Sequence, residues 1–261
     1  MKLLSDLTAT LQELGHTVTV LTGFPNWPSG RVYPGYRLRL WQRETLDGVS
    51  VIRVALFPDH SRNPVRRALN FISFAISAAF LGPWLVQRPD AIHVVHPPIT
   101  VGLPAWVLSR WWRIPFTMEI QDMWPENLES TGMVRSRRIL GLVGAFASWV
   151  YRGSVGIRVI SPGFLRNLIE KRVPPHKVRV ISNWVDADYY SPREPNRELA
   201  ARYGMAGRFN VLYAGTIGLA QGLDVVLAAA ESLRLSLPDV QFVLAGDGLD
   251  YERLKLEAQT R

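Results

Sequence analysis

The sequence predicts an α/β protein with two Rossmann-like domains, the second of them incomplete. Short apolar runs alternate along the chain with longer segments of helical period, a pattern typical of parallel sheets with right-handed crossovers. Residues 182–196 (SNWVDADYYSPREPN) interrupt this alternation with two prolines and no periodicity. We therefore predict a first domain at 1–185, whose first strand is missing, a linker at 186–205 and the start of a second domain at 206–261.

The first domain is expected to open on a helix whose leucines, between residues 3 and 14, share one face that Gly15 closes. Asp47-Gly48 is typical of a two-residue hairpin turn between strands at 37–43 and 49–54. The other expected strands are 16–22, 91–95, 116–120, 156–160 and 178–181, and the other helices are 64–86, 101–112, 136–151 and 162–171. The second domain is expected to have strands at 211–214 and 240–245, and helices at 222–235 and from 250 onward.

Composition excludes some classes of function. The chain has 261 residues and no cysteine, so it contains neither a disulfide framework nor a thiolate nucleophile or metal ligand. Its formal net charge is +8. Residues 135–179 alone carry ten basic residues against the single acid Glu170, a net +9. That charge would suit anionic lipid or nucleic acid, but no recognised nucleic-acid motif is present.

Residues 214–222 (AGTIGLAQG) predict a loop that binds phosphate. Glycines between a strand and a helix let the backbone approach a ligand, and the helix N-terminus presents free N–H groups. The loop has no lysine or arginine, and it fits neither the P-loop nor the dinucleotide pattern. A second loop, 245–248 (AGDG), lies at the same sheet edge, which favours a nucleotide site. The alternative is a pair of tight turns with nothing bound.

Residues 119–126 (EIQDMWPE) comprise the end of a predicted strand of the first domain and the loop after it. Asp122 and Glu126 could polarise an acceptor hydroxyl, and Trp124 could stack on a sugar ring. The alternative makes Asp122 a cap and Trp124 a core residue. His96 also lies at a carboxyl edge and is a further candidate. Asp186-Ala-Asp188 is similar to a metal-binding DxD pattern, but it stands in the linker, so we predict no metal site.

The helix expected at 64–86 has an almost wholly apolar body after Arg66 and Arg67. It is either a buried core helix or a helix that lies in the membrane interface. Trp111 and Trp112 would suit an interfacial aromatic belt. We expect association with a membrane surface.

Taken together, these stretches resemble retaining glycosyltransferases of family 4, which have the two-domain GT-B fold. The bacterial branch that builds O-antigen, capsule and colanic acid polysaccharides (WbuB-like) is the most similar. The stretches that carry the resemblance are VTVLTGFPNWPSG (18–30), QDMWPE (121–126), VISNWVDADYYSP (180–192), AGTIGLAQGLD (214–224) and LAGDG (244–248). They cover nearly the whole chain in the family's order.

The resemblance implies a cytoplasmic enzyme, peripheral on the inner face of the bacterial plasma membrane. It would move a sugar from a UDP-, GDP- or dTDP-sugar to a polyprenyl-linked saccharide, without a cofactor or an obligatory metal. Asp122 and Glu126 would be catalytic, His96 and Trp124 would bind the acceptor, and Asn183 and Asp186 would belong to a hinge. The donor would be bound by Gly215, Thr216, Gly218, Gln221, Gly222, Gly246, Asp247 and Gly248.

The sequence departs from the family's pattern in several places. Gln221 stands where relatives commonly have lysine, and Trp184 replaces a glycine of the hinge motif. The expected E-x7-E pair would lie beyond residue 261, and a first glycine loop would precede residue 1. The resemblance therefore implies a sequence truncated at both ends, with little activity by itself. The alternatives are a nucleotide-dependent oxidoreductase or epimerase, for which no G-x-G-x-x-G loop is seen, and a non-catalytic membrane-associated domain.

Overall fold

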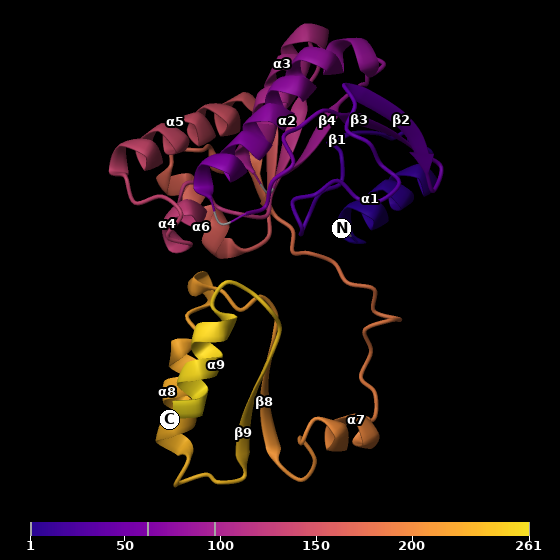
Figure 1. Ribbon diagram of the computed structural model, residues 1–261. Helices are drawn as coiled ribbons and strands as arrows, with labels where there is room; N and C mark the ends of the chain where they lie inside the picture. Colours follow the sequence, from indigo (N-terminus) through magenta and orange to yellow (C-terminus); the bar gives the residue numbers. More distant parts are fainter. Residues whose placement is uncertain (1, 62, 97, 261) are drawn as a thin grey trace. The chain divides into compact units, whose positions relative to one another are not determined.

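The computed structural model describes residues 2–61, 63–96 and 98–260, apart from the side chains of Lys2 and His96 (Figure 1). The chain forms two compact units. Unit 1 comprises Met1–Asn127 and Ser136–Trp184, and unit 2 comprises Leu128–Arg135 and Val185–Arg261.

Strands and helices alternate in unit 1, as the sequence predicts. The strands are β1 (Thr19–Gly23), β2 (Trp41–Leu46), β3 (Val49–Val54), β4 (Ile92–His96), β5 (Phe116–Ile120), β6 (Gly156–Val159) and β7 (Val178–Val180). The helices are α1 (Lys2–Glu13), α2 (Pro64–Leu85), α3 (Gly102–Trp112), α5 (Arg137–Gly153) and α6 (Pro162–Glu170), with 3₁₀ turns η1 (Ile99–Val101) and η2 (Pro175–Lys177). A short helix that the sequence pattern did not indicate, α4 (Glu126–Ser130), lies between β5 and α5.

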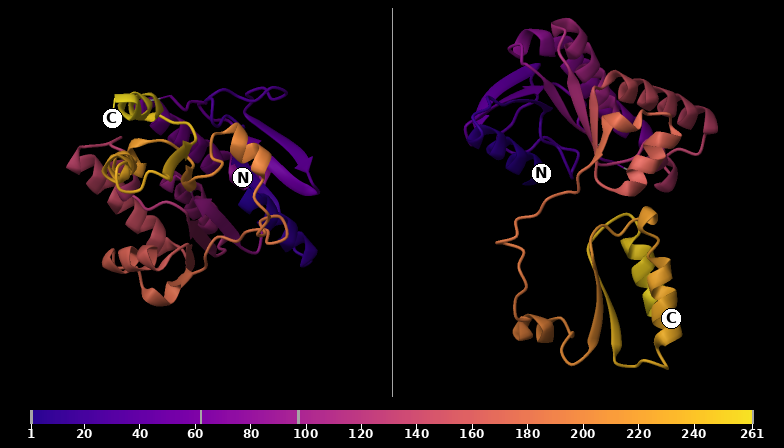
Figure 2. Two further views of the ribbon diagram at one scale, coloured as in Figure 1. Left: turned by 90° about the horizontal axis from the view of Figure 1, so that it is seen from below. Right: turned by 180° about the vertical axis from the view of Figure 1, so that it is seen from behind.

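The described strands of unit 1 form two sheets. One has the order β1-β3-β2, in which β1 and β3 are parallel and β2 and β3 form an antiparallel hairpin. The other has the order β4-β5-β6-β7 and is wholly parallel. Helix α3 packs between α2 and α5, α2 also contacts β1 and β3, and α3 contacts β4 and β5 (Figure 1). Figure 2 shows the strands from behind.

The first strand of the hairpin lies further along the chain than expected. It covers Trp41–Leu46, whereas the sequence predicted 37–43. Asp47 and Gly48 both have positive φ, which is the geometry of a type I′ turn and pairs Leu46 directly with Val49. This register places Trp41 opposite Val54, where β3 ends, so residues 37–40 have almost no partner strand left.

Unit 2 contains a parallel pair of strands, β8 (Phe209–Ala214) and β9 (Val240–Ala245). Its helices are α8 (Asp224–Leu233) and α9 (Tyr251–Thr260), with the 3₁₀ turn η3 (Leu219–Gln221) before α8. The helix expected from residue 222 therefore begins two residues later, because Gly222 has a φ of 59° and ends the 3₁₀ turn. The stretch that we predicted as linker includes a helix, α7 (Arg197–Arg202).

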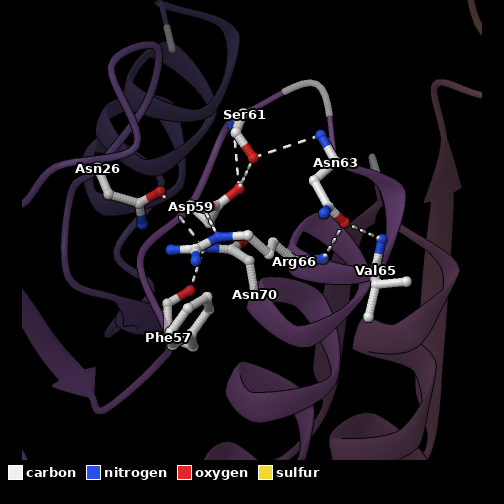
Figure 3. Close-up of polar contacts among 8 residues, drawn as sticks. All are labelled: Asn26, Phe57, Asp59, Ser61, Asn63, Val65, Arg66 and Asn70. Atoms are coloured by element: carbon white, nitrogen blue, oxygen red, sulfur yellow. Dashed lines mark hydrogen bonds and ion pairs between the residues drawn. The ribbon is translucent and has the colours of Figure 1, made fainter.

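Helix α2 has a well-defined start, because Asn63 caps it. The Asn63 side-chain oxygen accepts hydrogen bonds from the backbone N–H groups of Val65 (2.9 Å) and Arg66 (3.2 Å) (Figure 3). Pro64 occupies the first helical position, where its missing N–H costs no hydrogen bond. Ser136 holds the equivalent position before α5, but its side chain makes no capping hydrogen bond.

These two caps generate a matched prediction. Asn63→Ala is expected to lower the free energy of unfolding of unit 1 by about 1 kcal/mol, because two N–H groups lose their acceptor. Ser136→Ala is expected to change it by less than about 0.5 kcal/mol. All tryptophans of the sequence lie at or before Trp184, so tryptophan fluorescence during urea unfolding reports on unit 1. Equal effects of the two substitutions would contradict the cap assignment.

Candidate active site

A buried ion pair lies near the carboxyl ends of β5 and β6. Along β5, Met118 and Ile120 point into the core, so Thr117 and Glu119 lie on the opposite face of the sheet. Glu119 and Arg158 are register partners across β5 and β6, and their side chains meet at 2.6 Å. The Glu119 side chain is only 3 % exposed. A carboxylate buried to this degree needs hydrogen bonds and an opposite charge to offset its loss of hydration.

Arg158 binds the last segment of unit 1. Its guanidinium donates to the carbonyl oxygens of Ile181 (3.0 Å) and Ser182 (2.8 Å) and to the side-chain oxygen of Asn183 (3.1 Å). It also lies 4.8 Å from the ring centroid of Trp184, within the range of a cation–π contact. Arg158 therefore contacts every residue of the segment 181–184, which contains the predicted hinge residue Asn183.

Gln121 joins the same network from the loop after β5. Its amide exchanges two hydrogen bonds of 3.0 Å with the Asn183 amide and donates to a Glu119 oxygen at 2.5 Å. Glu119 is also contacted by His93 of β4, whose Nε2 is 3.5 Å from the carboxylate. Its Nδ1 is 3.0 Å from the hydroxyl of Thr117.

The network keeps Glu119 ionised. Burial raises the pKa of this carboxyl, but hydrogen bonds from His93, Arg158 and Gln121 and the positive charge of Arg158 outweigh burial and lower the pKa to about 2. Sequence reasoning missed Glu119, Gln121 and Arg158. A signal was present, because a glutamate and an arginine inside otherwise apolar strands need partners.

Asp122 follows this network directly and lies half-buried at the carboxyl end of β5. Burial raises the pKa of its carboxyl above the ordinary value. Among the residues that the structure describes, no cation or hydrogen-bond donor to this carboxyl is found that would lower it again. A carboxylate of this kind is a stronger base than an exposed aspartate and is suited to accept a proton.

Glu126, the other predicted catalytic acid, is held by α6. Its two carboxylate oxygens accept hydrogen bonds from Asn167 (2.8 Å) and Lys171 (2.7 Å). Burial raises the pKa of Glu126, but these two donors outweigh it and the net shift is downward. Lys171 also donates to the carbonyl oxygen of Trp124 at 2.8 Å, so it fixes both ends of the Trp124–Glu126 segment.

The predicted acceptor-binding residues are placed as follows. The Trp124 ring is 8 % exposed, so it presents little surface to a ligand as it stands, in keeping with the alternative of a core residue. The backbone of His96 ends β4, but its side chain lies outside the described residues.

A second polar cluster lies where α2 begins (Figure 3). Asp59 accepts hydrogen bonds from the Ser61 backbone N–H (2.9 Å) and hydroxyl (2.7 Å), and from Nε of Arg66 (2.7 Å). These contacts, with Arg66 the largest, lower the pKa of Asp59 to about 2. The Asn70 amide donates to the Phe57 carbonyl oxygen (2.8 Å) and to Asn26 (3.4 Å). The cluster thereby joins the loops after β1 and β3, another feature that the sequence did not reveal.

The two glycine loops of unit 2 contact each other through their backbones. The N–H of Gly215 donates to Ala245 and that of Ile217 to Asp247, both at 2.9 Å, and the N–H of Asp250 returns to Ile217 at 3.1 Å. A Cβ atom at Gly246 would overlap the carbonyl oxygen of Gly215, and one at Gly248 would overlap that of Ile217. Glycine is therefore required at both positions by the contact between the loops.

The first of these loops is anchored but keeps free donors. The Ile217 side chain is buried in the core of unit 2 with Leu223 and Leu254. Among the described residues, the backbone N–H groups of Thr216 and Gly218 make no backbone hydrogen bond. Gln221 and Gly222 are exposed beside them. The loop thus combines a fixed backbone with unpaired N–H groups, which is what an anion site made without lysine requires.

Asp224 adds negative charge in the first turn of α8, but Arg253 compensates it. Arg253 contacts Asp224 (2.8 Å), Asp250 (2.7 Å) and Glu257 (2.9 Å). The side chain of Asp247 accepts a hydrogen bond from the backbone N–H of Gly248 at 2.7 Å.

The structure gives Asp186 a local role at the start of the linker. Its side chain accepts hydrogen bonds from the backbone N–H groups of Asp188 (3.1 Å) and Tyr189 (3.0 Å). Within the described part of the chain, no group of three or more acidic or histidine side chains is arranged to hold a metal ion.

The Glu119 network generates a prediction about pH. Because the folded pKa (about 2) is below the ordinary 4.5, ionised Glu119 stabilises unit 1 fully above pH 4.5, and that stability is lost as the pH falls toward 2. Glu119→Gln is expected to cost about 2–4 kcal/mol at pH 7, and the gap to the unmodified chain should narrow between pH 4.5 and 2. Urea unfolding followed by tryptophan fluorescence measures the gap.

Glu13→Gln, at an exposed position of α1, is the control for loss of one carboxylate. A gap for Glu119→Gln that stays constant over this pH range would show that the carboxylate is not held ionised by Arg158.

The chain was compared with known proteins. Residues 3–184 match the model of a family described as "Glycosyl transferase 4-like domain". The putative colanic acid biosynthesis glycosyl transferase WcaI of Escherichia coli is 27 % identical over 269 residues, covering 100 % of this chain and 65 % of WcaI. Glycogen synthase of Mycobacterium tuberculosis is 27 % identical over 95 % of this chain and 58 % of its own length. The chain thus spans about two thirds or less of these relatives.

Solved structures agree with the fold. Sucrose-phosphate synthase from Thermosynechococcus elongatus superposes with a TM-score of 0.61 at 16 % identity, over 95 % of this chain and 59 % of that one. HepE from Anabaena in complex with UDP gives 0.56 at 17 % identity, over 74 % and 50 %. These neighbours are GT-B glycosyltransferases, which confirms the predicted fold class. Because the family model covers more than half of the sequence, the chain belongs to the glycosyl transferase 4-like domain family.

Proposed function

We propose that this protein transfers a sugar from a nucleotide diphosphate sugar to a saccharide acceptor. The observation that carries the proposal is the loop at 214–222, whose backbone is fixed by the neighbouring loop while the N–H groups of Thr216 and Gly218 make no backbone hydrogen bond to any residue that the structure describes. Backbone donors beside the start of a helix stabilise the charge of a leaving diphosphate without a metal. Membership of the family and the absence of a G-x-G-x-x-G loop from the sequence favour this proposal over an oxidoreductase or epimerase.

The proposed donor is a UDP-sugar, with GDP- and dTDP-sugars as the other candidates. The HepE neighbour was solved with UDP and with UDP-glucose, which supports the choice of UDP first. The diphosphate would lie against residues 215–222 and the nucleoside near Gly246, Asp247 and Gly248. No obligatory metal and no cofactor enter the proposal.

The proposed acceptor is a polyprenyl-linked saccharide used in cell-surface polysaccharide synthesis, of the O-antigen, capsule or colanic acid type. Similarity to WcaI, whose name refers to colanic acid biosynthesis, supports this choice. The proposed location is the inner face of the bacterial plasma membrane, where the protein would be peripheral. We further propose that the reaction retains the configuration of the anomeric carbon.

In the proposed reaction, an acceptor hydroxyl oxygen forms the new bond to the anomeric carbon. The bond from that carbon to the diphosphate oxygen breaks, and its electron pair leaves with the nucleoside diphosphate. The hydroxyl proton passes to a base, for which Asp122 is the proposed residue because burial raises the pKa of its carboxyl. Glu126, tied to Lys171, stays a second candidate for catalysis, and His96 and Trp124 stay candidates for acceptor contact.

The roles of the two carboxylates can be separated by substitution. In the full-length protein, Asp122→Asn is expected to lower kcat by about 10²–10⁴-fold and to leave the affinity for UDP unchanged. The rate of the unmodified enzyme should fall as the pH drops through the raised pKa of Asp122. This fall in rate at low pH should be absent from the variant. Transfer of radiolabelled sugar from each nucleotide sugar is the measurement.

Glu126→Gln is the variant to compare with Asp122→Asn. It removes the ion pair with Lys171, so it should lower the unfolding midpoint of unit 1. Unchanged turnover of Asp122→Asn would exclude Asp122 as the base. The transferase proposal itself would be wrong if no UDP-, GDP- or dTDP-sugar were bound or turned over.

A substitution in the glycine loop tests the donor site separately. Gln221→Lys places a cation beside the unpaired N–H groups, so UDP is expected to bind about two- to fivefold more tightly, and the gain should fade with added salt. Gln259→Lys adds the same charge at an exposed position of α9 and should have no effect on UDP affinity. Calorimetric titration with UDP measures both. Weaker binding by Gln221→Lys would show that the diphosphate does not lie at this loop.

A further inference from the structure

Helix α2 buries small side chains and leaves several of its large apolar ones exposed. Ala75, Ala78 and Gly82 are buried. A Cβ atom at Gly82 would already crowd Leu108 of α3 at 3.0 Å, so α3 packs closely against this face. By contrast, Ile76 is 57 % exposed and Phe80 and Trp84 are each 74 % exposed. A helix adapted to water has the reverse arrangement, because large apolar side chains gain most from burial.

The exposed side chains follow one stripe of the helix, with steps of three and four residues. We name this stripe the apolar strip of α2; it consists of Val65, Leu69, Ile72, Ile76, Phe80 and Trp84. Residues 68–86 contain no charged side chain at all. A continuous exposed strip of this length marks a surface that another apolar phase covers.

The apolar phase that best matches this strip is a membrane, which the helix lies on and does not cross. By length and composition α2 could span a bilayer: it has 22 residues, and its most apolar 18-residue window has a mean hydropathy of 1.6 and is 22 % buried. Its inner face, however, packs on α3, η1, β1 and β3 of the same unit (Figure 1). A helix fixed to a folded unit on one side presents only its outer side to lipid, which is the geometry of an interfacial helix.

Aromatic side chains mark the C-terminal end of the strip. The rings of Trp84 and Trp111 lie 5.7 Å apart in an edge-on arrangement, and Trp111, at the end of α3, is also exposed. Tryptophan is enriched at the level of lipid headgroups, where one side of the ring is apolar and the N–H stays hydrated. The two tryptophan rings would therefore place the C-terminal end of α2 at the level of the lipid headgroups.

A cationic cavity adjoins the end of α3. Arg110, Arg113, Ser109 and Trp106 line a space of about 560 Å³. The Arg110 guanidinium lies 5.6 Å from the centroid of the Trp106 ring. Within the described part of the chain, neither arginine forms an ion pair with a carboxylate. Two uncompensated guanidinium groups at the rim of an aromatic cavity are suited to a phosphate.

We propose that α2 and the end of α3 form a membrane-binding face, in which the apolar strip enters the interface and the cavity of Arg110 and Arg113 binds the phosphate of an anionic phospholipid. Charge decides between lipid and a protein partner. The strip has no polar groups to pair with a partner's backbone, and the adjoining cavity is positively charged, which matches the negative surface of a bacterial inner leaflet. The proposal needs no donor or acceptor, so it stands or falls independently of the transfer reaction.

Flotation of the full-length protein on vesicles tests the strip. The vesicles contain phosphatidylcholine alone or with phosphatidylglycerol, and no nucleotide sugar is added. Phe80→Asp is expected to reduce the bound fraction on both vesicle types, by about tenfold in partition coefficient. Leu14→Asp, which places the same charge at an exposed leucine beyond α1, should not change it. Equal flotation of both variants, with an unchanged unfolding midpoint by tryptophan fluorescence, would overturn the assignment of the strip.

A double substitution tests the cavity. Arg110→Gln with Arg113→Gln is expected to abolish most of the preference for phosphatidylglycerol, at least about tenfold, while binding to neutral vesicles persists. Arg137→Gln with Arg138→Gln removes the same charge from the exposed start of α5 and should retain most of the preference. If both double variants lost the preference equally, net charge and not the cavity would explain it, and the site would be rejected. Intact preference in the first variant would also reject it.

Discussion

The ion pair between Glu119 and Arg158 is the contact on which the carboxyl edge of unit 1 depends. The two side chains are buried together at 2.6 Å, and removal of either would leave an uncompensated charge in the protein. Arg158 is also the donor that fixes residues 181–183, and Glu119 accepts from Gln121, the residue before Asp122. One interaction between two strands therefore fixes both where the chain leaves unit 1 and how the loop that carries Asp122 begins.

This dependence shows what sequence patterns can and cannot predict. The bounds of β5 and β9 were predicted to the residue, because each is a short apolar run with clear flanks. Helices α4 and α7 were missed, since five or six residues are too few for a helical period. Asp122 was found because it follows a strand directly. Glu119 and Arg158 were not, because their contact depends on the register between β5 and β6, which are separated by α4 and α5.

The glycines of unit 2 show a related ambiguity, since one residue type serves two purposes. Gly246 and Gly248 are required because the backbone of residues 215–217 passes directly over them, and that requirement exists without any ligand. Their presence in the sequence is therefore weak evidence for a nucleotide site. The stronger observation is that, in the described part of the chain, the Thr216 and Gly218 N–H groups have no backbone acceptor while Ile217 anchors the loop. A rigid loop with free donors is preorganised for an anion, which a flexible glycine loop is not.

Helix α2 posed a question that hydropathy could not answer, because core helices and interfacial helices have the same apolar content. Side-chain size on each face separates them. Packing of Gly82 and Ala78 against the unit brings α2 close to α3, and the helical period places Ile76, Phe80 and Trp84 on the opposite, exposed side. The small residues thus serve the core and the exposed strip at once. Larger residues at 78 and 82 would push α2 away from α3 and open the core, so the inward and outward faces of this helix are constrained together.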